Sequence, residues 1–280
     1  MKPILVFQTD FTYKEGAVSS MYGVVKTVDR ELEIMDGTHE IPQYDTWSAS
    51  YRLYQSLQFW PEGTIYVSVV DPGVGTKRRA CVAKTVDGYY IVTPDNGTLT
   101  HIKRIVGIES VREIDESVNR LKSTRGTAIF HGRDLFGYTA ARLASGIIDF
   151  EGVGPEYPVE EIVEHPIYAP EINDGNVKGI FEIMDPNFGN LWTNIPIDSF
   201  KKAGFEYGDM VHVLIRCEGK TAFEKDVLFH KSFGYAEKGK PMVYNNELMK
   251  VAIAVSQGNM CKKYNLNFGP EWTVEFTKLK

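Results

Sequence analysis

The sequence has few cysteines, and they lie far apart. Cys81, Cys217 and Cys261 are odd in number and show no Cys-x-x-Cys spacing, so they predict neither a disulfide framework nor a zinc site. Long hydrophobic runs are also lacking. The apolar run near the start, Ile4–Phe7, is too short for the core of a signal peptide, and no later segment is apolar enough to span a bilayer. We therefore expect a cytoplasmic protein.

Clusters of basic residues are absent as well. The chain has 31 Lys and Arg against 37 Asp and Glu, a formal net charge of −6 at pH 7. Because affinity for phosphate groups comes from clustered cations, we expect no nucleic-acid partner. No pair of carboxylates or imidazoles has the spacing of metal ligands, so we expect no metal and no cofactor. With 280 residues, of which 43% are hydrophobic, the chain can form one large or two moderate domains.

The first half of the sequence alternates between apolar runs and amphipathic segments. Ile4–Gln8 predicts a buried strand, and apolar residues at helical spacing in Glu15–Val28 predict a helix that leads to a strand near Leu32–Met35. A second amphipathic segment, Thr46–Phe59, precedes another apolar run, Thr64–Val70. This repetition predicts a mostly parallel sheet with flanking helices, an α/β domain over residues 1–165.

Later segments of this half predict other elements. Cys81–Val86 and Tyr89–Val92 are joined by Asp-Gly, which suits a two-residue turn, and predict a hairpin. Gly132–Ser145 predicts a further helix. An acidic, proline-rich stretch around Glu156–Glu164 is typical of a linker rather than of a packed element.

The second half has a different texture. Its apolar runs are short, alternating or β-rich, and are separated by Gly and Asn. Such spacing predicts a small antiparallel barrel or sandwich, which we assign to a C-terminal β-barrel domain over residues 175–280. The runs are Val177–Met184, Met210–Cys217, Asp226–Ser232, Pro241–Tyr244 and Val251–Val255.

The loop after Thr64–Val70 carries the most chemistry. Asp71 comes at the carboxyl end of the predicted strand, where open α/β sheets bind their ligands. Gly73 and Gly75 permit a tight turn, and Arg78 and Arg79 bring cations back toward the carboxylate. Taken alone, this loop is more typical of an ordinary turn with solvated charges.

The other motifs favour function. In order along the chain, they are Thr9–Phe11, Asp36–Asp45, Thr93–Leu99, Phe130–Phe136 and Asp185–Ile195. With the Asp71 loop, their sequence and spacing closely resemble the S-adenosylmethionine hydroxide adenosyltransferase family, whose relatives include the adenosyl-halide synthases. The resemblance runs from about Ile4 to about Asn259. It implies an α/β domain followed by a β-barrel domain, which agrees with the pattern of elements.

The resemblance implies that the substrate is S-adenosylmethionine and that the reaction is its hydrolysis to adenosine and methionine. Asp71, Arg78 and His131 match the family positions that act on a water or hydroxide. We assign Asp71 and His131 to accepting or relaying the proton of that water, and Arg78 to holding the nascent hydroxide and favouring the charged form of Asp71. Position in the loop favours Arg78 over Arg79, but both stay open. A lone histidine such as His131 is otherwise typical of a core or a helix cap.

Six further residues match substrate-binding positions of the family. Asp10 would accept hydrogen bonds from the ribose hydroxyls, although a carboxylate there also suits a helix cap. Asp185 would bind the ammonium of the methionine part, and Phe188 and Asn190 would offer a ring face and an edge hydrogen bond to adenine. Tyr44 and Phe233 would also contact the nucleoside. The alternative for the Asp185 motif is an Asp-Pro-Asn turn, and the alternative for Tyr44 and Phe233 is ordinary packing.

The chain departs from the family pattern on the methionine side. Thr12 and Glu15 stand where the family usually has Gly and Asp, and residues 245–248, Asn-Asn-Glu-Leu, replace a turn rich in Ser and Gly. A related sulfonium therefore stays open as the preferred substrate. Two other functions stay open as well: an adenosyl-halide synthase, and a sensor of adenosyl compounds that lacks catalysis. The presence of Asp71 argues against the first, and the complete catalytic set argues against the second.

The nucleoside motifs are divided between the two predicted domains, so a complete pocket needs an interface. In the family this interface lies between neighbouring subunits of a trimer. We expect a homotrimer that binds a small-molecule substrate.

Overall fold

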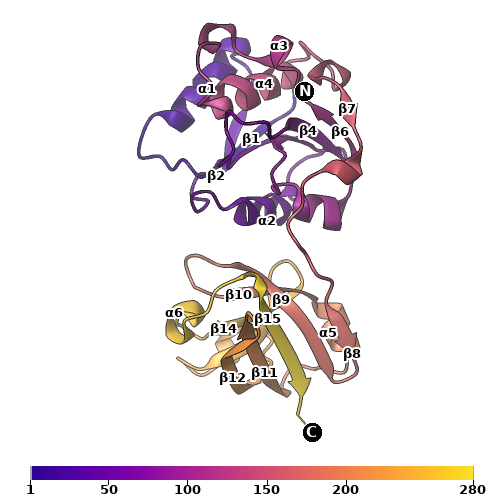
Figure 1. Ribbon diagram of the computed structural model, residues 1–280. Helices are drawn as coiled ribbons and strands as arrows, with labels where there is room; N and C mark the ends of the chain where they lie inside the picture. The colour runs from indigo at the N-terminus through magenta and orange to yellow at the C-terminus, as the bar shows by residue number, and fades with distance from the viewer. Residues whose placement is uncertain (1, 280) are drawn as a thin grey trace. The chain divides into compact units, whose positions relative to one another are not determined.

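The computed structural model describes residues 2–279. The chain divides into two compact units, one that ends at His165 and one that starts at Pro166 (Figure 1). The first unit is an α/β fold with a mostly parallel sheet, and the second is an antiparallel, barrel-like sheet. This is the fold class that the sequence predicts.

The sheet of the first unit has seven strands in the order β2-β1-β3-β5-β4-β6-β7. The pairs β1–β2, β1–β3 and β3–β5 are parallel, whereas β4 pairs antiparallel with both β5 and β6, and β6 with β7. The predicted hairpin is confirmed as β4 and β5. The strands are β1 (Leu5–Thr9), β2 (Ile34–Thr38), β3 (Ile65–Val69), β4 (Ala80–Thr85), β5 (Tyr90–Pro94), β6 (Ile108–Glu113) and β7 (Glu156–Tyr157).

Helices cover both faces of this sheet, and its central strands are therefore buried on both sides. The side chains of α1 (Ala17–Val28) and α4 (Tyr138–Ala144) share one core cluster with Phe7 and Val67. Residues of α2 (Thr46–Leu57) share a second cluster with Val6 on the opposite face. A short helix, α3 (Glu116–Asn119), and short helical turns complete the unit. The helix predicted over residues 132–145 begins as a π-helical turn, Gly132–Gly137, before α4.

The order of the strands creates a switch point between β1 and β3. From β1 the chain continues to β2 on one side, and it returns to β3 on the other side. Thr9 and Val69 are register partners, so the residues that follow these two strands lie at the same edge of the sheet. Open α/β sheets bind ligands at this position. Asp10 and Asp71 both lie here.

The interpretation of the acidic stretch as a linker is wrong. Within it, β7 pairs with β6, the Tyr157 hydroxyl donates to Asp95 with an O–O distance of 3.1 Å, and Ile162 is buried. Its acidic residues are also paired, Glu156 with Arg112, Glu161 with Arg79 and Glu164 with Lys103, and a composition alone does not reveal such partners. The chain leaves the first unit only after His165.

The second unit is an antiparallel sheet in the order β12-β11-β15-β9-β10-β14-β13, with β8 paired to β9. An isolated bridge between Phe229 and Val243 joins the two ends of this order, so the sheet is nearly closed. The strands are β8 (Glu171–Asn173), β9 (Asn176–Met184), β10 (Leu191–Pro196), β11 (Met210–Cys217), β12 (Lys220–Leu228), β13 (Pro241–Asn245), β14 (Lys250–Val255) and β15 (Gly269–Lys278), with the helices α5 (Ile197–Lys202) and α6 (Met260–Tyr264).

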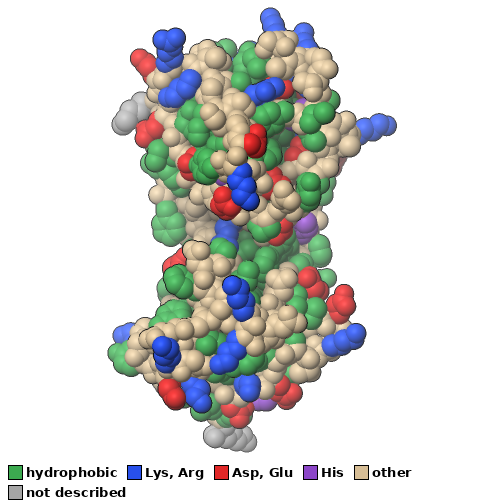
Figure 2. All heavy atoms as spheres, turned by 90° about the vertical axis from the view of Figure 1, so that its left-hand side faces the viewer, with side chains coloured by type: hydrophobic (Ala, Val, Ile, Leu, Met, Phe, Trp, Pro, Cys, Tyr) green, Lys and Arg blue, Asp and Glu red, His purple; other side chains and the backbone are tan. Residues whose placement is uncertain are grey.

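Apolar side chains from alternate positions of these strands fill the barrel. The rings of Phe200 and Phe205 stack with centroids 4.0 Å apart, and Phe229 and Phe276 meet Phe200 edge-on. On the molecular face that Figure 2 draws, basic and acidic side chains are interspersed over both units. Between residues 2 and 279, every helix is too short or too polar to cross a membrane.

Candidate active site

The loop that joins β3 to β4 carries Asp71 and Arg78. These two strands are not neighbours, since β5 lies between them, and the loop therefore crosses the carboxyl end of β5. Both ends of the loop are tied to residues that follow β5. The Asn96 side chain donates to the carbonyl of Val70 at 2.9 Å, and the amide of Asp95 donates to the carbonyl of Arg79 at 2.9 Å.

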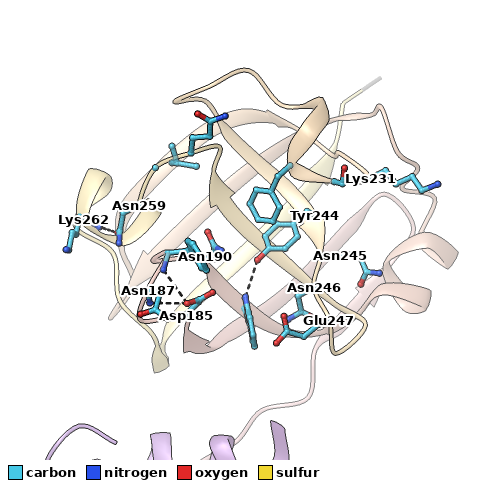
Figure 3. Close-up of a pocket in the computed structure, with 17 residues that line it drawn as sticks. Asp185, Asn187, Asn190, Lys231, Tyr244, Asn245, Asn246, Glu247, Asn259 and Lys262 are labelled. Atoms are coloured by element: carbon cyan, nitrogen blue, oxygen red, sulfur yellow. Dashed lines mark hydrogen bonds between the residues drawn. The ribbon is translucent and has the colours of Figure 1, made fainter. Parts of the chain in front are cut away.

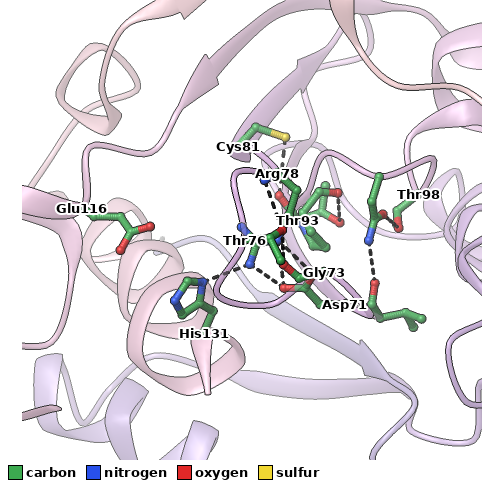
Figure 4. Close-up of polar contacts among 12 residues, drawn as sticks. Asp71, Gly73, Thr76, Arg78, Cys81, Thr93, Thr98, Glu116 and His131 are labelled. Atoms are coloured by element: carbon green, nitrogen blue, oxygen red, sulfur yellow. Dashed lines mark hydrogen bonds and ion pairs between the residues drawn. The ribbon is translucent and has the colours of Figure 1, made fainter. Parts of the chain in front are cut away.

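Within this loop, Arg78 lies between Asp71 and His131 (Figure 4). Its Nε donates to Asp71 Oδ1 and Oδ2 at 2.9 and 3.0 Å, and its Nη2 donates to Asp71 Oδ2 at 2.5 Å. The same Nη2 lies 2.9 Å from His131 Nδ1. The side chains of Arg78 and Asp71 are only 10% and 5% exposed. The structure thus brings the three predicted catalytic residues together in one buried line.

The geometry also separates the two candidate arginines. Arg79 points to another partner: its Nη2 lies 2.6 Å from Glu161 Oε2, and its guanidinium lies 4.5 Å from the centroid of the Tyr157 ring. Gly73 leaves room for the Arg78 side chain, because a Cβ at Gly73 would come 3.2 Å from it. Arg78 is therefore the arginine that contacts Asp71.

The contact with Arg78 decides how His131 holds its proton. An arginine only donates, so His131 Nδ1 accepts and the neutral ring carries its hydrogen on Nε2. Burial and, after it, the Arg78 charge lower the pKa of His131. The ring is 4% exposed, and Nε2 has no partner among residues 2–279. His131 is thus a neutral imidazole at neutral pH.

Asp10 lies beside this line of residues at the end of β1. One of its oxygens, Oδ2, accepts from the amide of Tyr44 at 2.9 Å. Burial raises the pKa of Asp10, backbone hydrogen bonds oppose this, and the negative charge of Asp71 adds to it. The Tyr44 side chain is 69% exposed. Asp10 does not serve as a helix cap, because α1 starts at Ala17 with Gly16 as its cap residue.

Two residues close to Asp10 have unusual backbone angles. Thr12 and Tyr44 have φ values of 57° and 65°. Residues other than glycine rarely adopt this region, and for a β-branched residue such as Thr12 it is a clear outlier that costs about 1–3 kcal/mol. Strain of this kind concentrates at functional sites. It marks the surroundings of Asp10 independently of any motif.

The remaining predicted residues lie in the second unit, where they line one pocket of about 900 Å³. Figure 3 shows Asp185 and Asn190 on one side, Asn245, Asn246 and Glu247 on the other, and the Tyr244 ring between them. Asp185 closes its own turn by accepting from the amides of Asn187 and Phe188 at 3.0 and 3.3 Å, so the turn is confirmed and the binding role stays a prediction.

Aromatic rings form the wall of this pocket. The Phe233 ring lies with its centroid 4.8 Å from that of Tyr244, and the Trp192 indole donates to the Tyr244 hydroxyl at 3.1 Å. Phe188 is 64% exposed, whereas Asn190 is buried. Reasoning from sequence missed Trp192 and Tyr244, although Trp192 stands within the quoted motif at residues 185–195. The pocket offers flat apolar faces with amide and carboxylate groups at its edge, a combination that suits a nucleoside.

Comparison with known proteins matches both units. The model of the SAM hydroxide adenosyltransferase N-terminal domain matches residues 5–154, and that of the C-terminal domain matches residues 179–273. The chain belongs to the SAM hydroxide adenosyltransferase family. Within residues 2–279 of this family member, no group of three or more His, Cys, Asp or Glu side chains is arranged to hold a metal ion.

Several relatives of this adenosyltransferase-family chain have names that state an activity. An (R)-S-adenosyl-L-methionine hydrolase of Methanocaldococcus jannaschii is 30% identical over 95% of this chain and 93% of the relative, and one of Thermus thermophilus is 30% identical over 96% and 98%. A fluorinase of Actinopolyspora mzabensis is 24% identical over 96% and 95%. The crystal structure of an uncharacterized conserved protein from Thermotoga maritima is 32% identical, with a TM-score of 0.88 over 98% of this chain and 100% of that chain.

Proposed function

We propose that the protein hydrolyses S-adenosyl-L-methionine to adenosine and L-methionine. The observation that carries the proposal is the buried line of Asp71, Arg78 and His131 beside Asp10, at the switch point of the sheet. The kinship with proteins named (R)-S-adenosyl-L-methionine hydrolase supports the choice of substrate and reaction.

The chemistry of a sulfonium explains why this set of residues suffices. An oxygen of water forms a bond to C5′ of the ribose while the bond from C5′ to sulfur breaks, and the electron pair of that bond goes to sulfur. The leaving group is a neutral thioether, so no acid is needed to expel it. The site has to place the oxygen in line and to accept the proton that water loses.

We assign these tasks from the observed contacts. Asp71 accepts the proton, because a carboxylate keeps lone pairs beyond those that Arg78 occupies. Arg78 stabilises the negative charge that develops on the oxygen. His131 holds Arg78 in place through Nδ1, and this contact leaves Nδ1 occupied. Of the two proton acceptors expected from the sequence, the arrangement therefore favours Asp71.

Substrate binding is divided between the two units. In the first unit, we assign Asp10 to the ribose hydroxyls and Tyr44 to the nucleoside face. In the second unit, the pocket that contains Asn190, Phe188 and Phe233 would take adenine, and Asp185 would take the methionine ammonium. We infer a homotrimer in which the substrate site is completed between subunits. We also propose a cytoplasmic location and a reaction that needs neither metal nor cofactor.

The kinship with fluorinases keeps an adenosyl-halide synthase as the second candidate. Its nucleophile would be an anion. Two like unit charges about 4 Å apart repel by about 4 kcal/mol at the effective dielectric constant of a protein surface. The Asp71 carboxylate would therefore repel a halide, although the paired Arg78 reduces this repulsion, whereas it attracts a water that can donate to it. The structure favours hydrolysis.

Incubation with S-adenosyl-L-methionine followed by chromatography tests the proposal. We expect adenosine and methionine in equal amounts. Formation of 5′-chloroadenosine in the presence of chloride would support the halide synthase instead, and unchanged substrate bound in a 1:1 ratio would indicate a sensor.

A further inference from the structure

Asp10 is carried by a turn that needs external support. Thr12 has a φ of 57°, which its β-branched side chain disfavours, and it follows Asp10 by only two residues. The carboxylate accepts a hydrogen bond from the Tyr44 amide, which orients it. Something else must hold the backbone of residues 9–12 in this conformation.

His39, which follows β2, supplies that support through both its side chain and its backbone. Its Nδ1 lies 2.8 Å from Thr9 Oγ1, and the same Oγ1 accepts from the amide of Phe11 at 3.1 Å. Its carbonyl accepts from the amide of Thr12 at 2.8 Å. The residues on both sides of Asp10 are thus held by one histidine.

A second set of contacts fixes the orientation of the imidazole. The Tyr22 hydroxyl donates to Asp36, so its oxygen accepts from His39 Nε2–H at 2.8 Å, and the same N–H lies 3.3 Å from Asp36 Oδ1. With its hydrogen on Nε2, the ring accepts at Nδ1 from the Thr9 hydroxyl. Every polar atom of the ring therefore has a defined partner.

His39 lies outside the line of catalytic residues. It is 1% exposed, and none of its hydrogen bonds among residues 2–279 reaches Asp71, Arg78 or His131. Its hydrogen bonds to Thr9 and Thr12 connect it to the turn that carries Asp10. This is the arrangement of a residue that supports a binding carboxylate.

We propose that His39, held by Tyr22 and Asp36, is a positioning residue that keeps the strained turn at residues 9–12 in the conformation in which Asp10 binds a ribose diol. The inference rests on the proposed function for the identity of the ligand. It specifies that ribose affinity depends on three side chains outside the line of Asp71, Arg78 and His131.

Adenosine binding, measured by calorimetry, is the first test. Tyr22→Phe removes the nearer of the two acceptors of Nε2–H, and His39→Ala removes the imidazole and its contact with Thr9 while keeping the backbone carbonyl that accepts from Thr12. We expect adenosine to bind about tenfold more weakly to each variant, while kcat for S-adenosyl-L-methionine stays within about twofold and KM rises. Tyr157→Phe is the matched control, since it removes a hydroxyl that donates to a different carboxylate, Asp95, in the same unit.

A rescue experiment separates positioning from general destabilisation. Glycine adopts positive φ without strain, so Thr12→Gly should remove the need for the support. In the double variant with His39→Ala, we expect adenosine affinity to return to within about threefold of the Thr12→Gly protein. Thermal melting and circular dichroism of each variant verify that it is folded. If His39→Ala does not fold, Tyr22→Phe takes its place in these measurements.

The outcomes distinguish this inference from the proposed function. If the protein binds adenosine but releases none from S-adenosyl-L-methionine, the function is wrong and the affinities still test His39. If hydrolysis occurs but the His39 and Tyr22 variants bind adenosine as the parent does, or if Thr12→Gly rescues nothing, the positioning role is refuted. A parent protein that neither hydrolyses the substrate nor binds adenosine refutes both.

Discussion

Arg78→Lys, compared with Arg79→Lys, tests the site at its centre. The guanidinium of Arg78 makes hydrogen bonds with both oxygens of Asp71 and with His131 Nδ1. A lysine keeps the positive charge but cannot span both partners, because its single ammonium lacks the planar fork. The neighbouring Arg79 meets Glu161 at a site where both side chains are more than a third exposed. The same change therefore removes very different contacts at adjacent positions.

The size of the expected loss follows from the contacts that disappear. Arg78→Lys loses at least one charge-assisted hydrogen bond, worth about 1.5–3 kcal/mol, and leaves a buried polar group partly unsatisfied. A loss of about 3 kcal/mol corresponds to a decrease of roughly 150-fold in kcat. Arg79→Lys alters an exposed ion pair worth about 0–1 kcal/mol in stability, so kcat should stay within about twofold.

The assay is the rate of adenosine formation at saturating S-adenosyl-L-methionine, with adenosine affinity measured separately. Affinity for adenosine should change little in either variant, because neither arginine is assigned to the nucleoside. Equal rates for the Arg78→Lys and parent proteins, or a larger loss in Arg79→Lys, would refute the assignment of Arg78.

Three further predictions follow from other parts of the structure. In oxygen-18 water with abundant chloride, the label should enter the 5′-hydroxyl of adenosine, and Asp71→Asn should lose most of kcat while still binding adenosine; label-free adenosine from the parent would mean that the oxygen does not come from water. Burial lowers the pKa of His165 below its unfolded value of about 6.5, so its contribution to stability is complete above that pH and is lost as the pH falls. The free energy of unfolding of the parent relative to His165→Asn should therefore decrease between pH 7 and pH 5. A difference that does not depend on pH in chemical denaturation would contradict this. Phe205→Ala removes a fully buried ring stacked on Phe200, which should cost about 3–5 kcal/mol of stability in urea unfolding; a cost under about 1 kcal/mol would contradict the packing described.

Much of the fold could be predicted because the relevant signals are local. Apolar runs and an Asp-Gly turn predicted β1, β3 and the β4–β5 hairpin, and the helical spacing in residues 15–28 predicted α1. The acidic stretch was misjudged because β7 depends on pairing with β6, which is distant in sequence. Pairing of this kind leaves almost no trace in the composition of a two-residue strand.

The site shows the same division. The motifs predicted the residues of the line at Asp71, and position in the loop favoured Arg78. The geometry then showed that Arg78, and not Arg79, contacts Asp71 and that His131 Nδ1 is occupied. His39 was part of a quoted motif, yet its contact with Thr9 depends on the alignment of β1 and β2. Hydrogen-bond partners depend on how the strands align in the folded structure. The spacing of residues along the chain does not show this alignment.

The loop over the end of β5 has a consequence for how this site can change during evolution or engineering. Its two ends are tied down at Val70 and Arg79, while Asp71 and Arg78 lie just inside these fixed points. A different number of residues between them could therefore be accommodated as an outward bulge, with the sheet left intact. If the proposed function holds, exchanging this one short segment could alter the nucleophile, because the residues assigned to the nucleoside come from other strands and loops.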